Sequence, residues 1–369
     1  MEKMKKSNSE NSKSNLIERI LKNSKSDLAD VLDKSEFFNN NLNVPLDIPL
    51  MNIGFSGNLR DGFSSGMNII AGPSRHFKSM LGLMAVKAFL NKFKDGAVIF
   101  YDSEFGTPKS YFKNLEIDMK RIIHNPIENI EQLKFDIVTQ IEDITSDDHV
   151  LIFIDSLGGL GSKKEVEDAI EGKSVADMTR AKEIKSLMRI ITPKLNIRKI
   201  PCFLVAHTYN TMEFMPKQVL GGGQGMMLAP NTVWFISRSK LKDKDKNIEG
   251  YTFTIKIEKS RMAKEESRLP IEITHDRGIK RFSGLIDLAV GFGIVAETSI
   301  GKRKAYDYKG LVVGSDVVAE HDEFWNKIFK ETKFSDMIEN KYTLGKKDES
   351  GKTFDFDNEV LESSIEENE

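Results

Sequence analysis

The chain has 369 residues and a formal net charge of −2, which allows one large domain or a core with smaller attachments. Its single cysteine excludes an internal disulfide, and no cysteine-based metal site is visible, so we expect a reducing compartment, most simply a cytoplasm. No apolar segment approaches the roughly 20 residues that a membrane helix needs, and the N-terminus lacks the apolar core of a secretory signal. We therefore expect a soluble protein without a membrane partner.

Residues 1–45 are expected to form an N-terminal arm. The first 14 residues or so are polar and predict disorder. From Leu16 to Phe38, apolar residues recur at helical spacing and predict one or two short amphipathic helices. Because this segment is too small to bury a core of its own, it must pack on its own core domain or on a neighbouring subunit.

The most informative motif is GPSRHFKS, which follows an apolar run at 67–71 and precedes a helical pattern. A loop in this position can turn its backbone N–H groups toward a phosphate at the positive end of the helix dipole. The motif fits G-x-x-x-x-G-K-[ST] except for its second glycine, and a left-handed backbone at that position costs an L-residue about 1–2 kcal/mol. The candidate phosphate-binding residues are Gly72, Pro73, Ser74, Arg75, His76, Phe77, Lys78 and Ser79. The alternative is an ordinary strand-to-helix turn with a solvated Lys78.

A second nucleotide residue is expected at the end of the continuous apolar run 150–155. Such a run is typical of a central parallel strand buried on both faces. Its last residue, Asp155, would lie beside the phosphate loop, where it and Ser79 could hold a magnesium ion. The alternative for Asp155 is an acid that starts a surface loop.

Two further strands end in polar residues. Residues 97–101 are followed by Asp102-Ser103-Glu104, and Glu104 could accept a proton from an attacking water. The alternative is a helix-capping cluster. Residues 201–206 are followed by His207, which could respond to the γ-phosphate or could be a hydrogen-bonded structural histidine.

From residue 46 onward, strands alternate with helical patterns, which predicts a mostly parallel sheet covered by helices. After Asn231 the pattern changes, and the strictly alternating run 251–258 predicts an antiparallel extension. The lysine-rich stretch 240–247 is expected to be a solvated turn, and residues 276–278 a hairpin turn. We expect this core domain to span 46–283.

Residues 284–346 are expected to form a small C-terminal domain, in which Phe324, Trp325 and Phe329 make a small core rather than a base-stacking surface. Residues 347–369 predict an acidic, disordered tail. From Asp348 onward the tail has nine acids and one lysine, and it could compete with an anionic polymer such as DNA or could serve solubility alone.

Two segments that follow central strands, 158–172 and 209–225, are too rich in glycine or charge to pack. Loops at this edge of an open α/β sheet face the ligand. Glycine amides, lysines and aromatic faces suit single-stranded nucleic acid, and the alternative is a flexible lid over a small-molecule substrate. The candidate DNA-binding residues are Lys163, Lys164, Tyr209, Met212, Phe214, Lys217, Gly221, Gly222 and Gly223.

These motifs together resemble the RecA family of strand-exchange recombinases, and among them the phage recombinases. The resemblance is carried by GPSRHFKS, by IFYDSEFGTPKSYF, by VLIFIDSLGGLGSKKEVEDA, by Ala206 to Thr208 with GGGQG beyond, and by IEKSRMAKE. These stretches belong to a similarity that covers about residues 35–300, and their order and spacing are highly specific.

The resemblance implies a RecA-type P-loop ATPase core that uses ATP and Mg²⁺ to assemble helical homopolymers on single-stranded DNA and to exchange strands with double-stranded DNA. It implies that Glu104 is the catalytic glutamate, that Tyr111 stacks on adenine, and that His207 senses the γ-phosphate. Lys259 and Arg261 resemble the paired cations that reach the ATP of the adjacent subunit. A single-strand-binding protein and a recombination mediator are implied partners. The alternatives are a hexameric helicase on the same core and an assembly protein for which ATP is only structural.

Overall fold

The computed structural model describes residues 16–35, 42–172, 179–212, 216–222, 225–242, 246–276 and 278–345. The chain divides into two compact units, residues 1–42 and 43–369. In the first unit, residues 16–23 are helical and η1 (Leu32–Lys34) is a short 3-10 helix, as the apolar spacing predicted. The expected disorder of the first residues and the acidic tail 347–369 fall outside the described residues.

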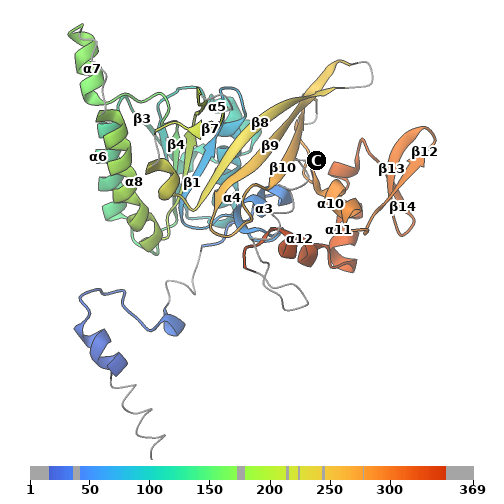
Figure 1. Cartoon of the computed structure of the whole chain (residues 1–369), viewed down its shortest axis with the longest axis horizontal. Coiled ribbons are helices and arrows are strands. Elements are labelled where there is room, and N and C mark those ends of the chain that lie inside the picture. The colour runs from blue at the N-terminus through green and yellow to red at the C-terminus, as the bar shows by residue number, and fades with distance from the viewer. Residues whose placement is uncertain are drawn as a thin grey trace, which may run out of the picture. The chain divides into compact units, whose positions relative to one another are not determined.

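The second unit is built on a nine-stranded sheet with the order β11-β10-β9-β8-β1-β5-β4-β2-β3 (Figure 1). The strands β8, β1, β5, β4, β2 and β3 are parallel, and β9, β10 and β11 extend the sheet in antiparallel fashion. The α/β class with an antiparallel extension is therefore confirmed. The strands are β1 (Gly66–Ala71), β2 (Ala97–Asp102), β3 (Ile122–Pro126), β4 (Val150–Asp155), β5 (Pro201–Ala206), β8 (Thr232–Lys242), β9 (Ile248–Ser260), β10 (Arg268–Thr274) and β11 (Gly278–Ile279).

Helices cover both faces of the parallel part. On one face, α6 and α8 lie side by side (Figure 1), and their apolar residues share a buried cluster with Ile152, Ile154 and Leu204 of the sheet. The helix α4 packs on the other face, against β1, β4 and β5. The helices of this region are α3 (Pro49–Ser56), α4 (Lys78–Lys92), α5 (Lys109–Asn114), η2 (Met119–Arg121), α6 (Ile130–Asp143) and α8 (Thr179–Ile197).

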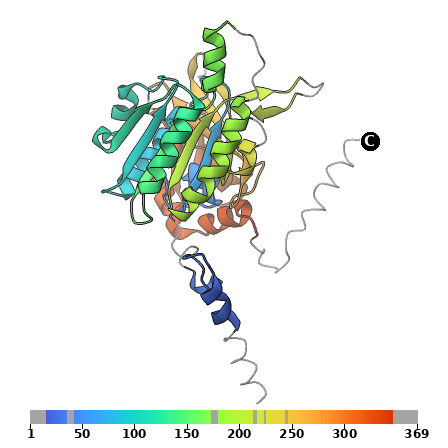
Figure 2. The same cartoon turned by 90° about the vertical axis from the view of Figure 1, so that its left-hand side faces the viewer.

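The segments expected to be loops contain short elements of their own. In the segment after β4, Ser162 and Glu165 form a capping box that starts a helix of charged residues. In the segment after β5, two short strands pair as a hairpin. Figure 2 shows the helix of charged residues, α7, projecting from the core. The elements are α7 (Lys163–Ile170), β6 (Thr208–Asn210), β7 (Gln218–Leu220) and α9 (Gly225–Leu228).

The long hairpin β8–β9 corrects one prediction. The stretch 240–247 was expected to be a turn, but β8 continues to Lys242, where Leu241 pairs with Gly250 and Lys242 with Ile248, so this strand extends into the first residues of the stretch. Cross-strand pairing decided the boundary, because Lys240 and Lys242 are exposed and leave no apolar pattern to read. The edge strand β3 was missed for a similar reason, since its residues are mostly exposed.

The C-terminal part combines helices with a small sheet. Phe324, Trp325 and Phe334 are fully buried and Phe282 stacks on Trp325, so the predicted aromatic core is present. The three-stranded sheet β12-β13-β14 was not predicted. The boundary after residue 283 stays a prediction. The elements are α10 (Leu285–Gly291), β12 (Ala296–Ile300), β13 (Arg303–Tyr308), β14 (Leu311–Gly314), η3 (Val318–Glu320), α11 (Asp322–Glu331) and α12 (Phe334–Tyr342).

Among the helices of the described ranges, none combines the length and the apolar character that crossing a bilayer requires.

The fold makes a prediction about Gly82, in the middle of α4. Alanine usually stabilises a helix interior relative to glycine by about 0.8–1.0 kcal/mol. Here a Cβ atom would lie 2.4 Å from the Phe153 ring, so we expect Gly82→Ala to lower the free energy of unfolding by about 1–3 kcal/mol. Gly291→Ala is the matched control, because nothing lies within 4 Å of its Cβ position. Urea denaturation of both variants checks this, and equal stability of the two would contradict it.

Candidate nucleotide-binding site

The candidate phosphate loop, residues 72–79, connects β1 to α4 and is called the phosphate loop below. Gly72 lies against β8, and a Cβ atom there would be 2.8 Å from the Ile236 carbonyl oxygen, so only glycine fits. Arg75 and Phe77 both have φ of +61°, the left-handed region. Each of these non-glycine residues carries a backbone strain of about 1–2 kcal/mol. The left-handed backbone that the motif demanded at its second glycine position is therefore present at Phe77.

Lys78 begins α4 and is buried, and its Nζ donates a hydrogen bond to the Pro73 carbonyl at 2.8 Å. Burial lowers the pKa of Lys78, while the carboxylates of Glu104 and Asp155 oppose that shift. An ammonium folded back over a loop of backbone amides lies where it can contact a bound phosphate.

Glu104 and Asp155 come close because β2 and β4 are parallel neighbours. Asp102, the last residue of β2, is paired with Asp155, the last residue of β4. Asp155 is buried and its Oδ2 accepts a hydrogen bond from the Thr107 hydroxyl at 2.9 Å. Its other oxygen, Oδ1, has no hydrogen-bond partner among the described residues. Burial raises the pKa of Asp155, and the nearby hydroxyls of Ser79 and Thr107 act against that rise.

An unpartnered carboxylate oxygen beside a serine hydroxyl fits a magnesium ion, which takes oxygen ligands and keeps most of its coordination for water and phosphate. In the described part of the chain, no cluster of three or more His, Cys, Asp or Glu is arranged around a metal position. Ser79 and Asp155 thus suit an ion that the nucleotide brings with it, and they do not form an all-protein cage.

Glu104 follows β2 and contacts residues that follow β4 and β5. Its Oε1 accepts a hydrogen bond from the Ser156 hydroxyl at 2.5 Å and lies 2.8 Å from His207 Nε2. Burial alone would raise the pKa of Glu104, but the contacts with Ser156 and His207 and the charge of Lys78 outweigh it, so the pKa lies below its ordinary value. The carboxylate is therefore ionised and oriented.

His207 packs against the segment that follows β4, and its position explains Gly158. A Cβ atom on Gly158 would lie 2.3 Å from His207 Cδ2, so the ring needs a glycine opposite it. The Arg180 guanidinium donates to the carbonyls of Leu157, Gly158 and Leu160 and shapes the segment that enters α7. The residues after β4 and after β5 are thus packed on each other at this edge.

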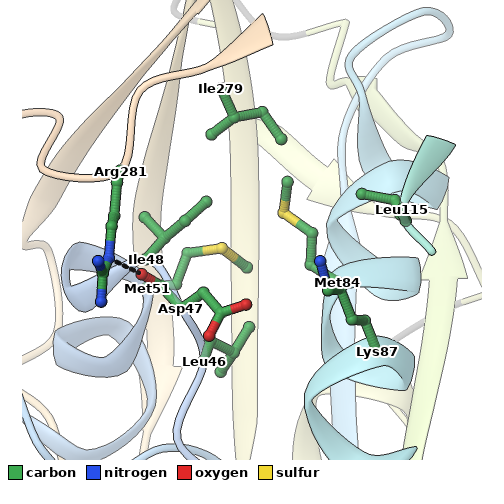
Figure 3. A pocket seen from close by; sticks show the side chains of 9 residues that line it. All are labelled: Leu46, Asp47, Ile48, Met51, Met84, Lys87, Leu115, Ile279 and Arg281. Carbon is green, nitrogen blue, oxygen red and sulfur yellow. Dashed lines mark hydrogen bonds between the residues drawn. The ribbon is translucent and has the colours of Figure 1, made fainter. Parts of the chain in front are cut away.

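Tyr111 lies on α5, and its ring is exposed. Leu115, one helical turn later on the same side, lines a pocket of about 250 Å³ that runs along α4 (Figure 3). The pocket is mostly apolar, and the guanidinium of Arg281 at its edge donates to the Asp47 carbonyl. Its lining residues are Leu46, Asp47, Ile48, Met51, Met84, Lys87, Leu115, Ile279 and Arg281.

Lys259 and Arg261 lie at the end of β9, away from the phosphate loop of their own chain. Lys259 Nζ donates to the carbonyls of Met227 and Leu228 at 2.6 and 2.9 Å, which caps the C-terminal end of α9. Burial lowers the pKa of Lys259, and the charge of Arg261 lowers it further.

Among the described candidate DNA-binding residues, Lys163 and Lys164 lie on α7, and the others lie in the β6–β7 hairpin or directly after it. Lys163, Lys164 and Lys217 are exposed, as are Tyr209 and Met212. Gly221 packs on the Tyr209 ring, and Gly222 has a φ of +104° that favours glycine. Phe214 and Gly223 lie outside the described residues.

Four residues near the site were not found from the sequence. Ser156 and Thr107 contact the two acids, and their positions directly after Asp155 and in the turn after Glu104 could have suggested them. Arg238 and Phe253 contact the phosphate loop from the β8–β9 hairpin. No local pattern marks these two, because their strands are distant from the loop in sequence.

The fold and the site first define a class: an α/β nucleotide-binding protein with a phosphate loop after β1 and acids after β2 and β4. Residues 58–280 match the model of the RecA N-terminal domain. The chain is 40% identical to the "Recombination and repair protein" of Enterobacteria phage T4, over 96% of this chain and 90% of that protein. It is also 24% identical to "Protein RecA" of Cytophaga hutchinsonii, over 74% of this chain and 77% of that protein. The chain therefore belongs to the RecA family of recombinases.

The contacts of Glu104 predict a pH dependence. Hydrogen bonds to an ionised carboxylate stabilise the charged form, so removing the Ser156 hydroxyl raises the pKa of Glu104. If Glu104 must be ionised to act, Ser156→Ala moves the acidic limb of the kcat/KM profile for ATP to higher pH. Ser162→Ala, which removes the side-chain cap of α7, is the control. An unchanged acidic limb in Ser156→Ala would separate Glu104 from the titrating step.

Proposed function

We propose that this chain is a DNA-dependent ATPase that forms helical filaments on single-stranded DNA and exchanges strands with a homologous duplex. The observation that supports this most directly is the grouping of residues at the carboxyl ends of the parallel strands. A buried lysine, an unpartnered carboxylate oxygen and an oriented glutamate meet there, and the two exposed segments with DNA-binding composition leave from the same edge. The family and the 40% identical phage protein agree with this assignment.

For the nucleotide, we place the phosphates in the loop Gly72–Ser79 with Lys78 against the β- and γ-phosphates. Ser79 and Asp155 would hold a Mg²⁺ ion, which supplies positive charge to the phosphate oxygens as negative charge builds up on them. The adenine would stack on Tyr111, beside the pocket along α4. The deep burial of Lys78 and Asp155 lowers the effective dielectric around these charges and strengthens their interactions with phosphate.

For hydrolysis, Glu104 would accept the proton of the attacking water. Its Oε1 is already bound by Ser156 and His207, so the same hydrogen bonds that orient the carboxylate also limit its basicity. His207 directly precedes β6, the first strand of the hairpin that carries Tyr209. A shift of the imidazole between Glu104 and a γ-phosphate would therefore move the start of a DNA-binding segment.

Lys259 and Arg261 would act in the next subunit of a filament. Cations supplied by a neighbour stabilise developing phosphate charge only when two subunits meet, so hydrolysis depends on assembly. A head-to-tail interface that does not close extends into a helix, and the arm formed by residues 1–45 is the proposed contact with the neighbour.

A hexameric helicase with the same core is the less favoured function, because the similarity to the T4 recombination and repair protein extends over nearly the whole chain. Single-stranded and double-stranded DNA are the proposed partners, together with a single-strand-binding protein and a recombination mediator. Cytoplasm, where the DNA of an infecting phage is copied, is the proposed location.

The first prediction from this function concerns turnover. We expect single-stranded DNA to stimulate ATP hydrolysis strongly, Lys78→Ala to abolish both the basal and the stimulated rates, and Glu104→Gln to lower the stimulated rate by at least about 100-fold. Release of phosphate with and without oligonucleotide measures this. Glu104→Gln should still bind nucleotide, since the amide keeps the size of the side chain. Glu116→Gln, an exposed acid that only pairs weakly with Lys87, is the matched control. Full turnover in Glu104→Gln would show that another group is the base.

The second prediction concerns assembly. With ATP, magnesium and single-stranded DNA, electron micrographs should show open helical filaments, and closed rings would favour the helicase.

DNA binding should weaken steeply with salt and vary little with sequence, because phosphate contacts dominate. Lys259→Ala and Arg261→Ala should bind nucleotide as monomers but lose the stimulated hydrolysis. Fluorescence anisotropy of labelled oligonucleotides at several salt concentrations measures the DNA binding, and release of phosphate measures the hydrolysis.

A further inference from the structure

The phosphate loop holds two strained residues without a glycine to relieve them, at Arg75 and Phe77. Both are contacted by the β8–β9 hairpin. The Phe77 ring stacks on Phe253, with centroids 5.0 Å apart and planes 26° from parallel. The Arg238 guanidinium donates to the Arg75 carbonyl at 3.1 Å.

The two hairpin residues that reach the loop are themselves neighbours. Arg238 of β8 and Phe253 of β9 are directly paired across the strands. The Arg238 guanidinium also lies over the Tyr251 ring, 4.9 Å from its centroid, and Tyr251 meets His275 edge to face. Phe253 is buried, so the ring that stacks on Phe77 is withdrawn from solvent.

We propose that Arg238 and Phe253 are positioning residues that hold the phosphate loop in its nucleotide-binding shape. The Phe77–Phe253 stack and the Arg238 contact are together called the loop clamp below. A left-handed backbone is unfavourable for L-residues, so a loop with Phe77 at this position relaxes unless something outside it stabilises the strained form. Stacked aromatic rings and a charge-assisted hydrogen bond from a regular hairpin provide that stabilisation.

The loop clamp has a consequence for binding. The conformation that turns the loop amides toward phosphate is the conformation in which Phe77 reaches Phe253, so nucleotide affinity depends on the hairpin. Glycine at position 77 would adopt the left-handed form without help, and the dependence on Phe253 would then disappear. This inference rests on the proposed binding of nucleotide phosphates by the loop and adds the residues that shape it.

The test is a double-mutant cycle on the full chain, with the dissociation constant of a fluorescent ADP analogue as the readout in the presence of magnesium. The variants are Phe253→Leu, Phe77→Gly and the double variant. Leucine keeps an apolar side chain in the buried position while removing the ring. We expect Phe253→Leu to weaken binding about 3- to 10-fold when residue 77 is phenylalanine, the range that aromatic stacking gives. In the Phe77→Gly background, the same change should alter affinity by less than about 2-fold.

Three further variants separate positioning from general stability. Phe253→Tyr keeps the ring and should restore affinity, whereas a purely structural defect would follow the melting temperature of each variant. Thr252→Ala, on the opposite face of β9, is the matched control and should bind as the unmodified chain does. Arg238→Ala removes the contact with the Arg75 carbonyl and should weaken binding in both backgrounds at position 77.

An equal effect of Phe253→Leu in both backgrounds, or no effect in either, would overturn the loop clamp while leaving nucleotide binding intact. If the unmodified chain failed to bind the ADP analogue at all, the proposed function would fail instead. The two failures are therefore distinguishable in the same set of titrations.

Discussion

The parallel pairing of β1, β5, β4 and β2 is the constraint on which the rest of this molecule depends. Parallel strands end at one edge, so the residues that follow them meet there although they are distant in sequence. Glu104 comes to lie 2.8 Å from His207 because β2 and β5 both pair with β4. Each of these strands is buried along most of its length, because helices cover both faces of this part of the sheet.

The electrostatics of this edge follow from its burial. Asp155 and Lys78 are withdrawn from water, and burial acts against the charged form of each. Glu104 differs, because two hydrogen bonds outweigh its burial and keep it ionised. Burial disfavours the anion of Asp155 and hydrogen bonds favour the anion of Glu104, so the pKa values of the two carboxylates are separated. The separation is a matter of environment, since the side chains are chemically alike.

The antiparallel extension does more than widen the sheet. Lys259 and Arg261 lie at the C-terminal end of β9. The middle of the same strand carries Phe253, whose ring stacks on Phe77 of the phosphate loop. A single strand thereby connects the proposed contact with a neighbouring subunit to the residues that shape the nucleotide site. In the structure of the single chain, Lys259 caps α9, directly after the segment proposed to bind DNA. The proposed contacts with nucleotide, neighbour and DNA therefore lie on elements that are connected through β9 and α9.

Sequence patterns were enough to predict the parallel core, the loop between β1 and α4, and the positions of Glu104 and Asp155 at the ends of strands. These features follow from local rules: a strand buried on both faces is continuously apolar, and a phosphate loop has its own spacing. They did not predict β3 or the small C-terminal sheet; β3 and β12 are mostly exposed and lack an apolar pattern.

Nor could local patterns predict Ser156, Thr107, Arg238 or Phe253 as neighbours of the site. By itself the sequence determined the chemistry available at each strand end and the family to which the chain belongs. Only the tertiary structure decided which side chains hold Glu104, and that Phe77 can occupy a position where the motif has glycine. The physical reason is that these contacts join residues far apart in sequence, and their geometry is set by strand pairing and packing, which no short stretch of the chain encodes.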